Sequence, residues 1–256
     1  IIAQGKAELA QALPPDGYAI LNYDDPLVRP MADKTEAQVF YYGMTDEAHL
    51  WADGVVGLGL EGIRFRLHYR DETLHLRVPL IGRHSVQTAL RAAAVGMVCG
   101  LTWQEIIEGL HSMSTQLRLI SVRSERGALL LDDTYNASPE SMLSALNLLA
   151  EISGRKVAVL GDMLELGQYE WRGHELVGIR VAEVVEELIT IGERGRMIAA
   201  AACRAGLPAA CITELETVEE AIELLQGRLR AEDVVLVKGS HGMHMERIVA
   251  ALEYTV

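Results

Sequence analysis

The sequence predicts an α/β fold, and three observations carry that prediction. Short apolar runs such as residues 129–131 and 233–237 have the length and composition of buried strands. From Pro139 onward such runs alternate with longer segments of helical periodicity, which is typical of a mainly parallel sheet covered on both faces. Residues 50–78 instead alternate apolar and polar side chains, as half-exposed antiparallel strands do.

Length, charge and cysteine usage restrict the class of protein. The 256 residues are enough for one large or two modest domains. The formal net charge of −13 argues against non-specific nucleic-acid binding, and no apolar run is long enough to span a membrane. The first residues lack the pattern of a secretory signal, and the three cysteines show no CxxC spacing. We therefore expect a cytoplasmic protein with neither a nucleic-acid nor a membrane partner.

Residues 1–115 are expected to form a first domain. A helix is expected at its start, with Ile2, Leu9 and Leu13 on one apolar stripe. Thr102 and Glu105 have the spacing of a capping box that opens a later helix. The expected elements are a helix over 1–13, strands over 18–22 and 39–42, a β-meander over 50–60, 63–69 and 73–78, and a helix over 86–100.

Residues 116–256 are expected to form a second domain, because a polar break over 109–115 separates the two patterns. A strand pair opens this domain, and helices then alternate with strands. The expected strands are 119–123, 128–131, 156–160, 189–191, 210–212 and 233–237, and the expected helices are 140–152, 174–188, 195–205, 218–228 and 243–253.

A polar turn after the strand over 128–131 is the first candidate for chemistry. Asp132 and Asp133 end the strand, and Ser138 and Pro139 have the residue types of an N-cap and a first helical position. A parallel strand that ends in acids beside a helix start is where open α/β proteins bind ligands. The two carboxylates could hold a ribose hydroxyl or a metal-bound phosphate, or one of them could simply cap the turn.

This turn also carries a family resemblance. The run Asp-Asp-Thr-Tyr-Asn-Ala-Ser-Pro-Glu-Ser over 132–141 resembles the signature of the Mur ligases, which build the peptide of bacterial cell-wall precursors. Two later runs, Gly-Asp-Met-Leu-Glu-Leu-Gly over 161–167 and Val-Lys-Gly-Ser-His-Gly-Met-His-Met-Glu over 237–246, resemble the same family. All three are most similar to the members that add D-alanyl-D-alanine to UDP-N-acetylmuramoyl tripeptide.

The resemblance implies an ATP-dependent amide ligase that works through an acyl phosphate, with Mg²⁺ as cofactor and ATP as co-substrate. It also implies a cytoplasmic monomer whose partners are the UDP-linked tripeptide and D-alanyl-D-alanine. Residues 1–115 would be the latter part of the central ATP-binding domain, with its β-meander. Residues 116–256 would be the complete Rossmann-like, mainly parallel carboxyl-terminal domain.

The resemblance further implies roles for individual residues. Lys6 matches the lysine that these ligases carbamylate, so that its oxygens help to hold Mg²⁺, although Gly5 stands where the family usually has alanine. Residues that would contact ATP are His84, Thr88, Arg118, Asp133 and Asn136. Catalysis would involve Lys6, Lys238 and Asp162, and substrate binding would involve Glu165, His174, Gly239 and Ser240.

The same residues leave other functions open. The chain could be a non-catalytic module that binds a nucleotide or a substrate, or a ligase of the same fold that resembles folylpolyglutamate synthase. A dehydrogenase is disfavoured because no Gly-x-Gly-x-x-Gly follows any expected strand. His241 and His244 have the spacing of a weak metal pair, but no third ligand is evident, and we interpret them as polar loop residues.

The sequence contains no Gly-x-x-x-x-Gly-Lys-Ser/Thr phosphate-binding loop, which Mur ligases carry near the start of their central domain. The resemblance therefore implies that this loop and an amino-terminal uridine-nucleotide domain precede Ile1. We predict that the chain by itself does not turn over ATP, because it lacks the lysine and hydroxyl that grip the β- and γ-phosphates. Purified chain supplied with Mg²⁺, ATP, UDP-tripeptide and D-alanyl-D-alanine should release no phosphate above the blank. Clear release would contradict the argument.

Overall fold

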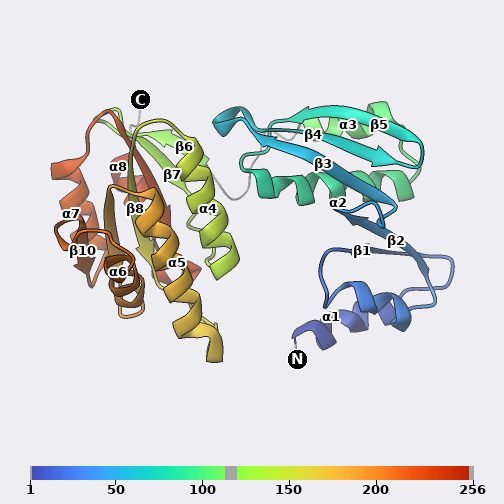
Figure 1. Ribbon diagram of the computed structural model, residues 1–256, viewed down its shortest axis with the longest axis horizontal. Helices are drawn as coiled ribbons and strands as arrows, with labels where there is room; N and C mark the ends of the chain where they lie inside the picture. The colour runs from blue at the N-terminus through green and yellow to red at the C-terminus, as the bar shows by residue number, and fades with distance from the viewer. Residues whose placement is uncertain (1, 113–119, 254–256) are drawn as a thin grey trace. The chain divides into compact units, whose positions relative to one another are not determined.

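The structure is a computed structural model that describes residues 2–112 and 120–253 (Figure 1). The chain divides into two compact units, Ile1–Thr115 and Gln116–Val256, which we call unit 1 and unit 2 and describe separately. Among the described residues, no helix combines the length and the apolar composition that crossing a bilayer requires.

Unit 1 contains one five-stranded sheet in the order β1-β2-β3-β4-β5. Strands β1, β2 and β3 run parallel, and β3, β4 and β5 run antiparallel, so the expected β-meander continues a parallel sheet. The strands are β1 (Tyr18–Asn22), β2 (Gln38–Gly43), β3 (Leu50–Gly57), β4 (Ile63–Tyr69) and β5 (Glu72–Val78). The α-helices are α1 (Ile2–Gln11), α2 (Val86–Val98) and α3 (Trp103–His111), with 3₁₀ turns at Arg29–Lys34, Gly59–Glu61 and Arg83–Ser85.

Helices α2 and α3 form the main core of unit 1 with the sheet. The expected capping box of Thr102 and Glu105 is present at the start of α3. The expected stripe on α1 was wrong at Leu9, which is 75% exposed, although Leu13 packs against the core as expected. The helix buries Ala7 and Ala10 against β1. Small side chains at this face let the helix backbone approach the sheet closely, which a leucine would prevent.

Unit 2 contains a six-stranded sheet in the order β10-β9-β8-β11-β7-β6, in which only the edge strand β6 runs antiparallel. The strands are β6 (Ile120–Arg123), β7 (Leu129–Asp132), β8 (Arg155–Gly161), β9 (Glu187–Ile191), β10 (Ile212–Leu215) and β11 (Asp233–Lys238). The α-helices are α4 (Pro139–Glu151), α5 (Glu170–Val184), α6 (Gly195–Arg204), α7 (Val218–Arg228) and α8 (Glu246–Leu252), with 3₁₀ turns at Gly167–Tyr169, Ala209–Cys211 and His241–Met243.

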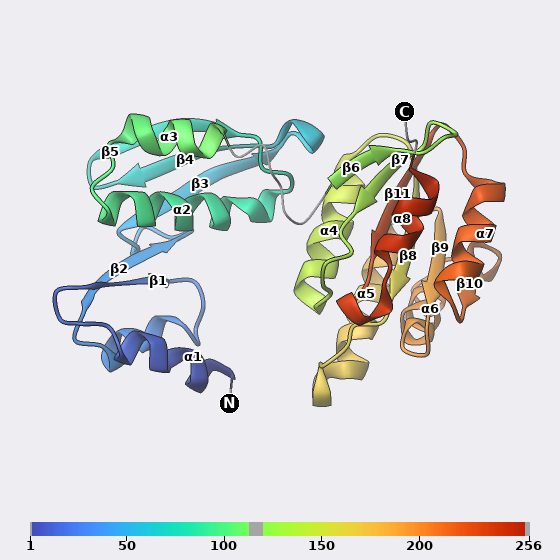
Figure 2. The same ribbon diagram turned by 180° about the vertical axis from the view of Figure 1, so that it is seen from behind.

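Helices cover both faces of the unit 2 sheet, as its unbroken apolar strands predict. Successive strand residues point to opposite faces, so Leu131 packs with α4, α5 and α6, whereas Leu130 packs with α7 and α8. Figure 1 shows α4 and α5 in front of the sheet, and Figure 2 shows α8 in front of the opposite face. The Rossmann-like, mainly parallel architecture expected for this part of the chain is confirmed.

Several element ends of unit 2 differ from the expected ones. Helix α5 ends at Val184 rather than at residue 188, and β9 begins at Glu187 rather than at residue 189. Helix α8 begins at Glu246 rather than at residue 243, because His241–Met243 forms a 3₁₀ turn. Helix α5 begins at Glu170 rather than at residue 174, because the 3₁₀ turn Gly167–Tyr169 leads directly into it and an acidic residue suits a helix amino terminus. Strand β10 begins at Ile212 rather than at residue 210, because the segment after Pro208 forms a 3₁₀ turn. These differences move element ends but do not change the strand order.

The connections of unit 2 create a switch point at the carboxyl end of β11. The neighbouring strand β8 leads into α5 on one face of the sheet, whereas β11 leads into α8 on the other face. Chains that leave in opposite directions open a crevice between the carboxyl ends of their strands, and this crevice is where open α/β sheets bind ligands. The topology therefore directs attention to the residues that follow β7, β8 and β11.

Helices α5 and α6 approach closely at Gly178. A Cβ atom added there would lie 2.4 Å from the carbonyl oxygen of Ile198 and 2.5 Å from the Cβ of Ala201. We predict that Gly178→Ala lowers the free energy of unfolding by about 1–3 kcal/mol, because the two helices must move apart. Urea unfolding followed by circular dichroism measures this change.

The matched control is Gly227→Ala in α7, where no atom lies within 4 Å of the added Cβ. This substitution should be neutral or stabilising by up to about 1 kcal/mol, because alanine favours the helix. Equal destabilisation by both substitutions would contradict the role assigned to close packing at Gly178.

Candidate functional site

A buried lysine lies at the switch point of unit 2. Strand β11 is buried along its whole length, and Lys238 at its end has only 1% of its side chain exposed. Its ammonium Nζ lies 2.7 Å from Oδ2 of Asp133 and donates to the carbonyl oxygen of Asn136 at 2.8 Å. A second donation, to the carbonyl oxygen of Asp133, spans 3.4 Å. The lysine therefore joins the end of β11 to the turn after β7.

The two adjacent carboxylates of this turn have different surroundings. Oδ1 of Asp132 accepts from the backbone nitrogen and the hydroxyl of Thr134, at 3.1 and 2.6 Å, so Asp132 caps the turn. The side chain of Asp133 faces Lys238 and is 14% exposed. The turn ends at the expected N-cap Ser138, which forms a reciprocal capping box with Ser141. Of the alternatives left open by the sequence, turn capping thus belongs to Asp132.

Asp162 follows β8 on the same edge of the sheet as Lys238, as the sequence predicts. Its buried carboxylate accepts from the backbone nitrogen of Gly195 at 2.8 Å and lies 3.5 Å from Nη1 of Arg194. Asp162 thereby holds the start of α6 against the end of β8. A contact between this carboxylate and a substrate stays a prediction.

Ser240 links the loop after β11 to the loop after β8. Its backbone nitrogen donates to the carbonyl oxygen of Asp162 at 3.0 Å, and its hydroxyl accepts from the backbone nitrogen of Leu164 at 2.8 Å. At Gly239, an added Cβ would lie 2.9 Å from Cγ of Met245 and 3.3 Å from Cα of Gly161. The two loops therefore approach backbone to backbone, which only glycine at this position permits.

The imidazole of His174 holds the loop after β8 in place through two hydrogen bonds. The side chain is fully buried, its Nδ1 donates to the carbonyl oxygen of Glu170 at 2.7 Å, and its Nε2 accepts from the backbone nitrogen of Met163 at 3.1 Å. This pair of bonds assigns the neutral tautomer with the proton on Nδ1. Glu165, by contrast, is exposed at the tip of the same loop, with a left-handed backbone φ of 63°.

Arg194 contacts the candidate residue Asp162, and sequence reasoning missed it. Its Nε donates to Glu170 at 2.5 Å, and this hydrogen bond, with a smaller contribution from Asp162, raises the pKa of the guanidinium. The arginine thus ties α6, α5 and the end of β8 together. Its sequence context, an exposed-looking turn before a helix, contains no signal that would single it out.

Two histidine rings lie near Tyr135, which belongs to the turn that contacts Lys238. Tyr135 is exposed, and its ring centroid lies 6.2 Å from that of His241, which in turn lies 6.2 Å from His244. Nδ1 of His244 is 3.3 Å from a carboxylate oxygen of Glu246. Across the described residues, no group of three or more His, Cys, Asp or Glu side chains is arranged to hold a metal ion.

The candidate residues of unit 1 lie on its surface. His84 occupies the 3₁₀ turn before α2, and Thr88 lies exposed in the first turn of that helix. The hydroxyl of Ser85 donates to the carbonyl oxygen of Ile81 at 2.6 Å instead of capping α2. Lys6 is exposed on α1. Arg118 lies outside the described residues, so its assignment to ATP stays a prediction.

Removal of the Lys238 charge should test the pair formed with Asp133. We predict that Lys238→Met lowers the free energy of unfolding by about 3–5 kcal/mol, because it leaves Asp133 facing an apolar side chain. Combined with Asp133→Asn in a double-mutant cycle, it should show a coupling of about 0.5–3 kcal/mol in urea unfolding.

Lys156→Met is the matched control for Lys238→Met, because Lys156 is half-buried and its ammonium donates to the carbonyl oxygen of Gly154, at 3.2 Å. Its effect should stay within about 0.5 kcal/mol. Additive effects of Lys238→Met and Asp133→Asn would show that the pair contributes no interaction of its own.

Two domain families match the chain. The Mur ligase middle domain matches residues 1–96, and the Mur ligase, glutamate ligase domain, matches residues 117–241. The UDP-N-acetylmuramoyl-tripeptide–D-alanyl-D-alanine ligases of Mycobacterium tuberculosis and Bacillus subtilis are 35% and 29% identical to it, over 276 and 255 aligned residues. Each alignment covers 98% of this chain and 54% of the relative.

A solved structure agrees with these matches. The crystal structure of MurF from Acinetobacter baumannii superposes with a TM-score of 0.82 at 28% identity, and covers 97% of this chain and 54% of that chain. The chain thus spans about half the length of the relatives it matches. The two matched domains, the relatives and the motifs around Lys238 together show that this chain belongs to the Mur ligase family.

Proposed function

We propose that the protein containing this chain is an ATP-dependent ligase that adds D-alanyl-D-alanine to UDP-N-acetylmuramoyl tripeptide. The observation that carries this proposal is the junction of Lys238 with the Asp133–Asn136 turn, formed by two of the three motifs that resemble those ligases. The names of the relatives support the same choice of substrate. The chemistry requires ATP, which favours a cytoplasmic location.

The proposed reaction has two steps. The terminal carboxylate of the tripeptide attacks the γ-phosphorus of ATP, which forms an acyl phosphate and releases ADP. The amine of D-alanyl-D-alanine then attacks the acyl carbon, loses a proton and expels inorganic phosphate, so that an amide bond forms. Both steps depend on positioning and on the neutralisation of negative charge, rather than on covalent chemistry of the protein.

Lys238 and Asp133 would act together in this scheme. In the structure the Asp133 carboxylate balances the Lys238 ammonium, which also fixes the turn through the carbonyl oxygen of Asn136. We propose that Asp133 turns to a ribose hydroxyl of ATP, beside Asn136. The positive charge of Lys238 then becomes available to a phosphate or carboxylate of the reacting groups. This coupling links the residue assigned to ATP with the residue assigned to catalysis.

The loop after β8 would face the substrates. Glu165 is exposed at its tip, and we propose that its carboxylate meets a peptide amine. His174, Asp162 and Ser240 would act mainly by holding this loop, since their polar atoms bond to backbone atoms or to Arg194. Gly239 would do so through its close approach to Gly161. A precise loop matters because a shift of about 1 Å in a reacting group lowers a rate by roughly a hundredfold.

Unit 1 would contribute to nucleotide and metal binding. His84 and Thr88 would contact the nucleotide at the start of α2, and Arg118, which belongs to unit 2, would contact it as well. A carbamate on Lys6 would supply oxygen ligands to Mg²⁺, which neutralises phosphate charge when bound. The exposed ammonium leaves room for this modification. No atom lies within 4 Å of a Cβ added at Gly5, so the replacement of the usual alanine by glycine leaves the packing there unchanged.

We predict that Lys6→Ala strongly lowers ligation in a protein that carries this chain together with the upstream phosphate-binding loop. The physical reason is the loss of the carbamate oxygens that help to hold Mg²⁺. Formation of the UDP-linked pentapeptide from MgATP, UDP-tripeptide and D-alanyl-D-alanine measures the effect. A short-chain carboxylic acid added to the assay should restore part of the activity of Lys6→Ala.

Lys34→Ala serves as the control, because Lys34 is another lysine of unit 1 and ends the 3₁₀ turn Arg29–Lys34. Its activity should match that of the unsubstituted protein. Full activity of Lys6→Ala would remove Lys6 from the site. Absence of any pentapeptide from the unsubstituted protein would favour the non-catalytic binding module, and product formed with glutamate and a folate instead would favour the folylpolyglutamate type of ligase.

A further inference from the structure

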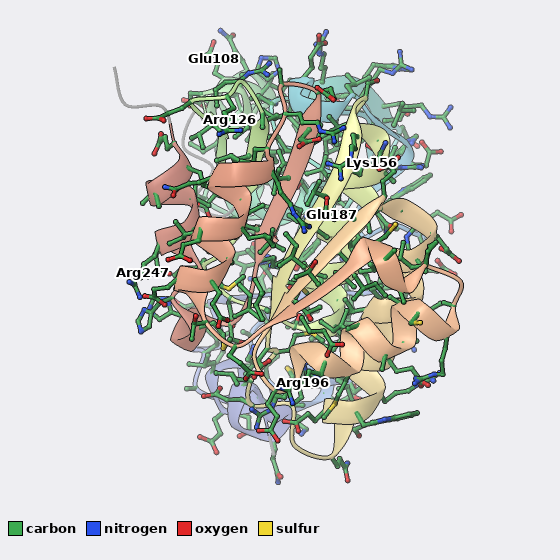
Figure 3. All side chains as sticks on the ribbon, turned by 90° about the vertical axis from the view of Figure 1, so that its left-hand side faces the viewer. Glu108, Arg126, Lys156, Glu187, Arg196 and Arg247 are labelled. Carbon is green, nitrogen blue, oxygen red and sulfur yellow. The ribbon has the colours of Figure 1, made fainter. Side chains whose placement is uncertain are left out.

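Unit 2 has a cavity at the end of its sheet opposite to Lys238. The cavity has a volume of about 550 Å³ and lies where the parallel strands begin, beside the first residues of β8 and β9 and the segment that leads into β11. The residues that line it are Arg126, Arg155, Glu186, Glu187, Ala210, Cys211, Gly227, Arg228, Leu229 and Arg230. Figure 3 shows Arg126 and Glu187 toward this end of the strands and Arg196 toward the other. We call these lining residues the arginine rim.

Arginines outnumber acids in the arginine rim. Four of its residues are arginines and two are glutamates, in a chain whose formal net charge is −13. A local excess of positive charge on an acidic protein attracts anions selectively to that place. The lining is mainly polar and charged, so an apolar ligand does not fit it.

The acidic side chains near the cavity are already engaged. Glu187 pairs with Arg155 and, at 3.0 Å, with Arg228, while the buried Asp233 pairs with Arg155 at 3.0 Å. Burial by itself would lower the pKa of Arg155, but its hydrogen bonds to Asp233 and Glu187 outweigh burial and raise it. A carboxylate of Glu186 accepts from the backbone nitrogen of Lys156 at 2.6 Å. These contacts leave little acidic capacity for the remaining arginines.

Arg126 and Arg230 are held much more loosely. Nη1 of Arg126 donates to the carbonyl oxygen of Gly227 across 3.4 Å, and Nη1 of Arg230 lies 4.0 Å from an exposed carboxylate of Glu232. Each guanidinium has five N–H donors in a planar fork, so these contacts use only a small part of its capacity. Both side chains are exposed and can turn toward a ligand in the cavity.

A purely structural role accounts for only part of this arrangement. Arg126 and Arg228 lie at the carboxyl end of α7, where positive side chains favour the helix dipole. That role does not explain why Arg230 joins the same cavity, whose own lining contains two fewer acids than arginines although Asp233 and Glu232 pair with these arginines from outside it. An anion that bridged the guanidiniums would relieve their repulsion and occupy their planar forks.

We propose that the arginine rim binds a phosphate-bearing small molecule through Arg126, Arg228 and Arg230, at a site separate from the candidate active site. The cavity volume lies within the range of small-molecule sites, roughly 300–1,000 Å³. Arg155 would hold Glu187 away from the ligand, because Glu187 accepts from both Arg155 and Arg228. The ligand class is defined by two or more phosphate groups, which present bidentate oxygens to several forks at once.

Calorimetric titration of the full chain with inorganic pyrophosphate tests the proposal. The unsubstituted chain should bind the probe with a dissociation constant below about 1 mM at low salt. The double variant Arg126→Ala/Arg230→Ala should bind at least about tenfold more weakly, and Arg126→Lys/Arg230→Lys, which keeps the charges but loses the forks, should fall between the two. Thermal unfolding of each variant checks that the fold is intact.

The matched control is Arg196→Ala/Arg247→Ala, which removes the same charge from two exposed arginines outside the cavity lining. These arginines pair with Glu216 and Glu219, and Figure 3 shows them away from Arg126. The control should bind pyrophosphate as the unsubstituted chain does. An equal loss in both double variants would reduce the effect to overall charge and overturn the proposal. So would the absence of pyrophosphate binding, or binding of a polyglutamate peptide with no binding of pyrophosphate.

Discussion

The buried ammonium of Lys238 is the interaction on which the candidate site depends. A cation that is almost fully removed from water must be balanced by fixed acceptors, and here these are the carboxylate of Asp133 and the carbonyl oxygen of Asn136. The turn after β7 supplies the acceptors that the lysine needs, and the lysine in turn fixes the shape of that turn. The capping of that turn by Asp132 and of α4 by Ser138 completes the same arrangement.

Most polar side chains around this lysine bind the protein itself. Ser240 and His174 bond to backbone nitrogens of the loop after β8, and Asp162 holds the start of α6. A buried polar group that lost its partner would be costly, so these bonds make the loop rigid. Serine, histidine and aspartate are residue types that often act directly in catalysis. The contacts of Ser240, His174 and Asp162 instead indicate that they position exposed side chains, such as that of Glu165.

The two ends of the unit 2 sheet differ in electrostatic character. The carboxyl ends of the strands carry one buried cation that is closely paired with a carboxylate. The amino ends carry the arginine rim, where positive side chains exceed the acids that line the cavity. Membership in the Mur ligase family accounts for the first end through the motifs that form it. The second end is formed by residues outside those motifs, so the family resemblance alone provides no reason for it.

The sequence by itself determined the order of helices and strands, the capping box at Thr102, the N-cap at Ser138, and the placement of Lys238 and Asp162 on one edge of a parallel sheet. These features are local, because periodicity, capping residues and strand direction are written in neighbouring residues. Only the tertiary structure decided that Lys238 pairs with Asp133, that α1 buries alanines instead of Leu9, and that distant arginines share one cavity. Those outcomes depend on the order of the strands in the sheet. Strand β11 lies between β8 and β7, so Lys238 contacts Asp133, which is 105 residues away in the sequence.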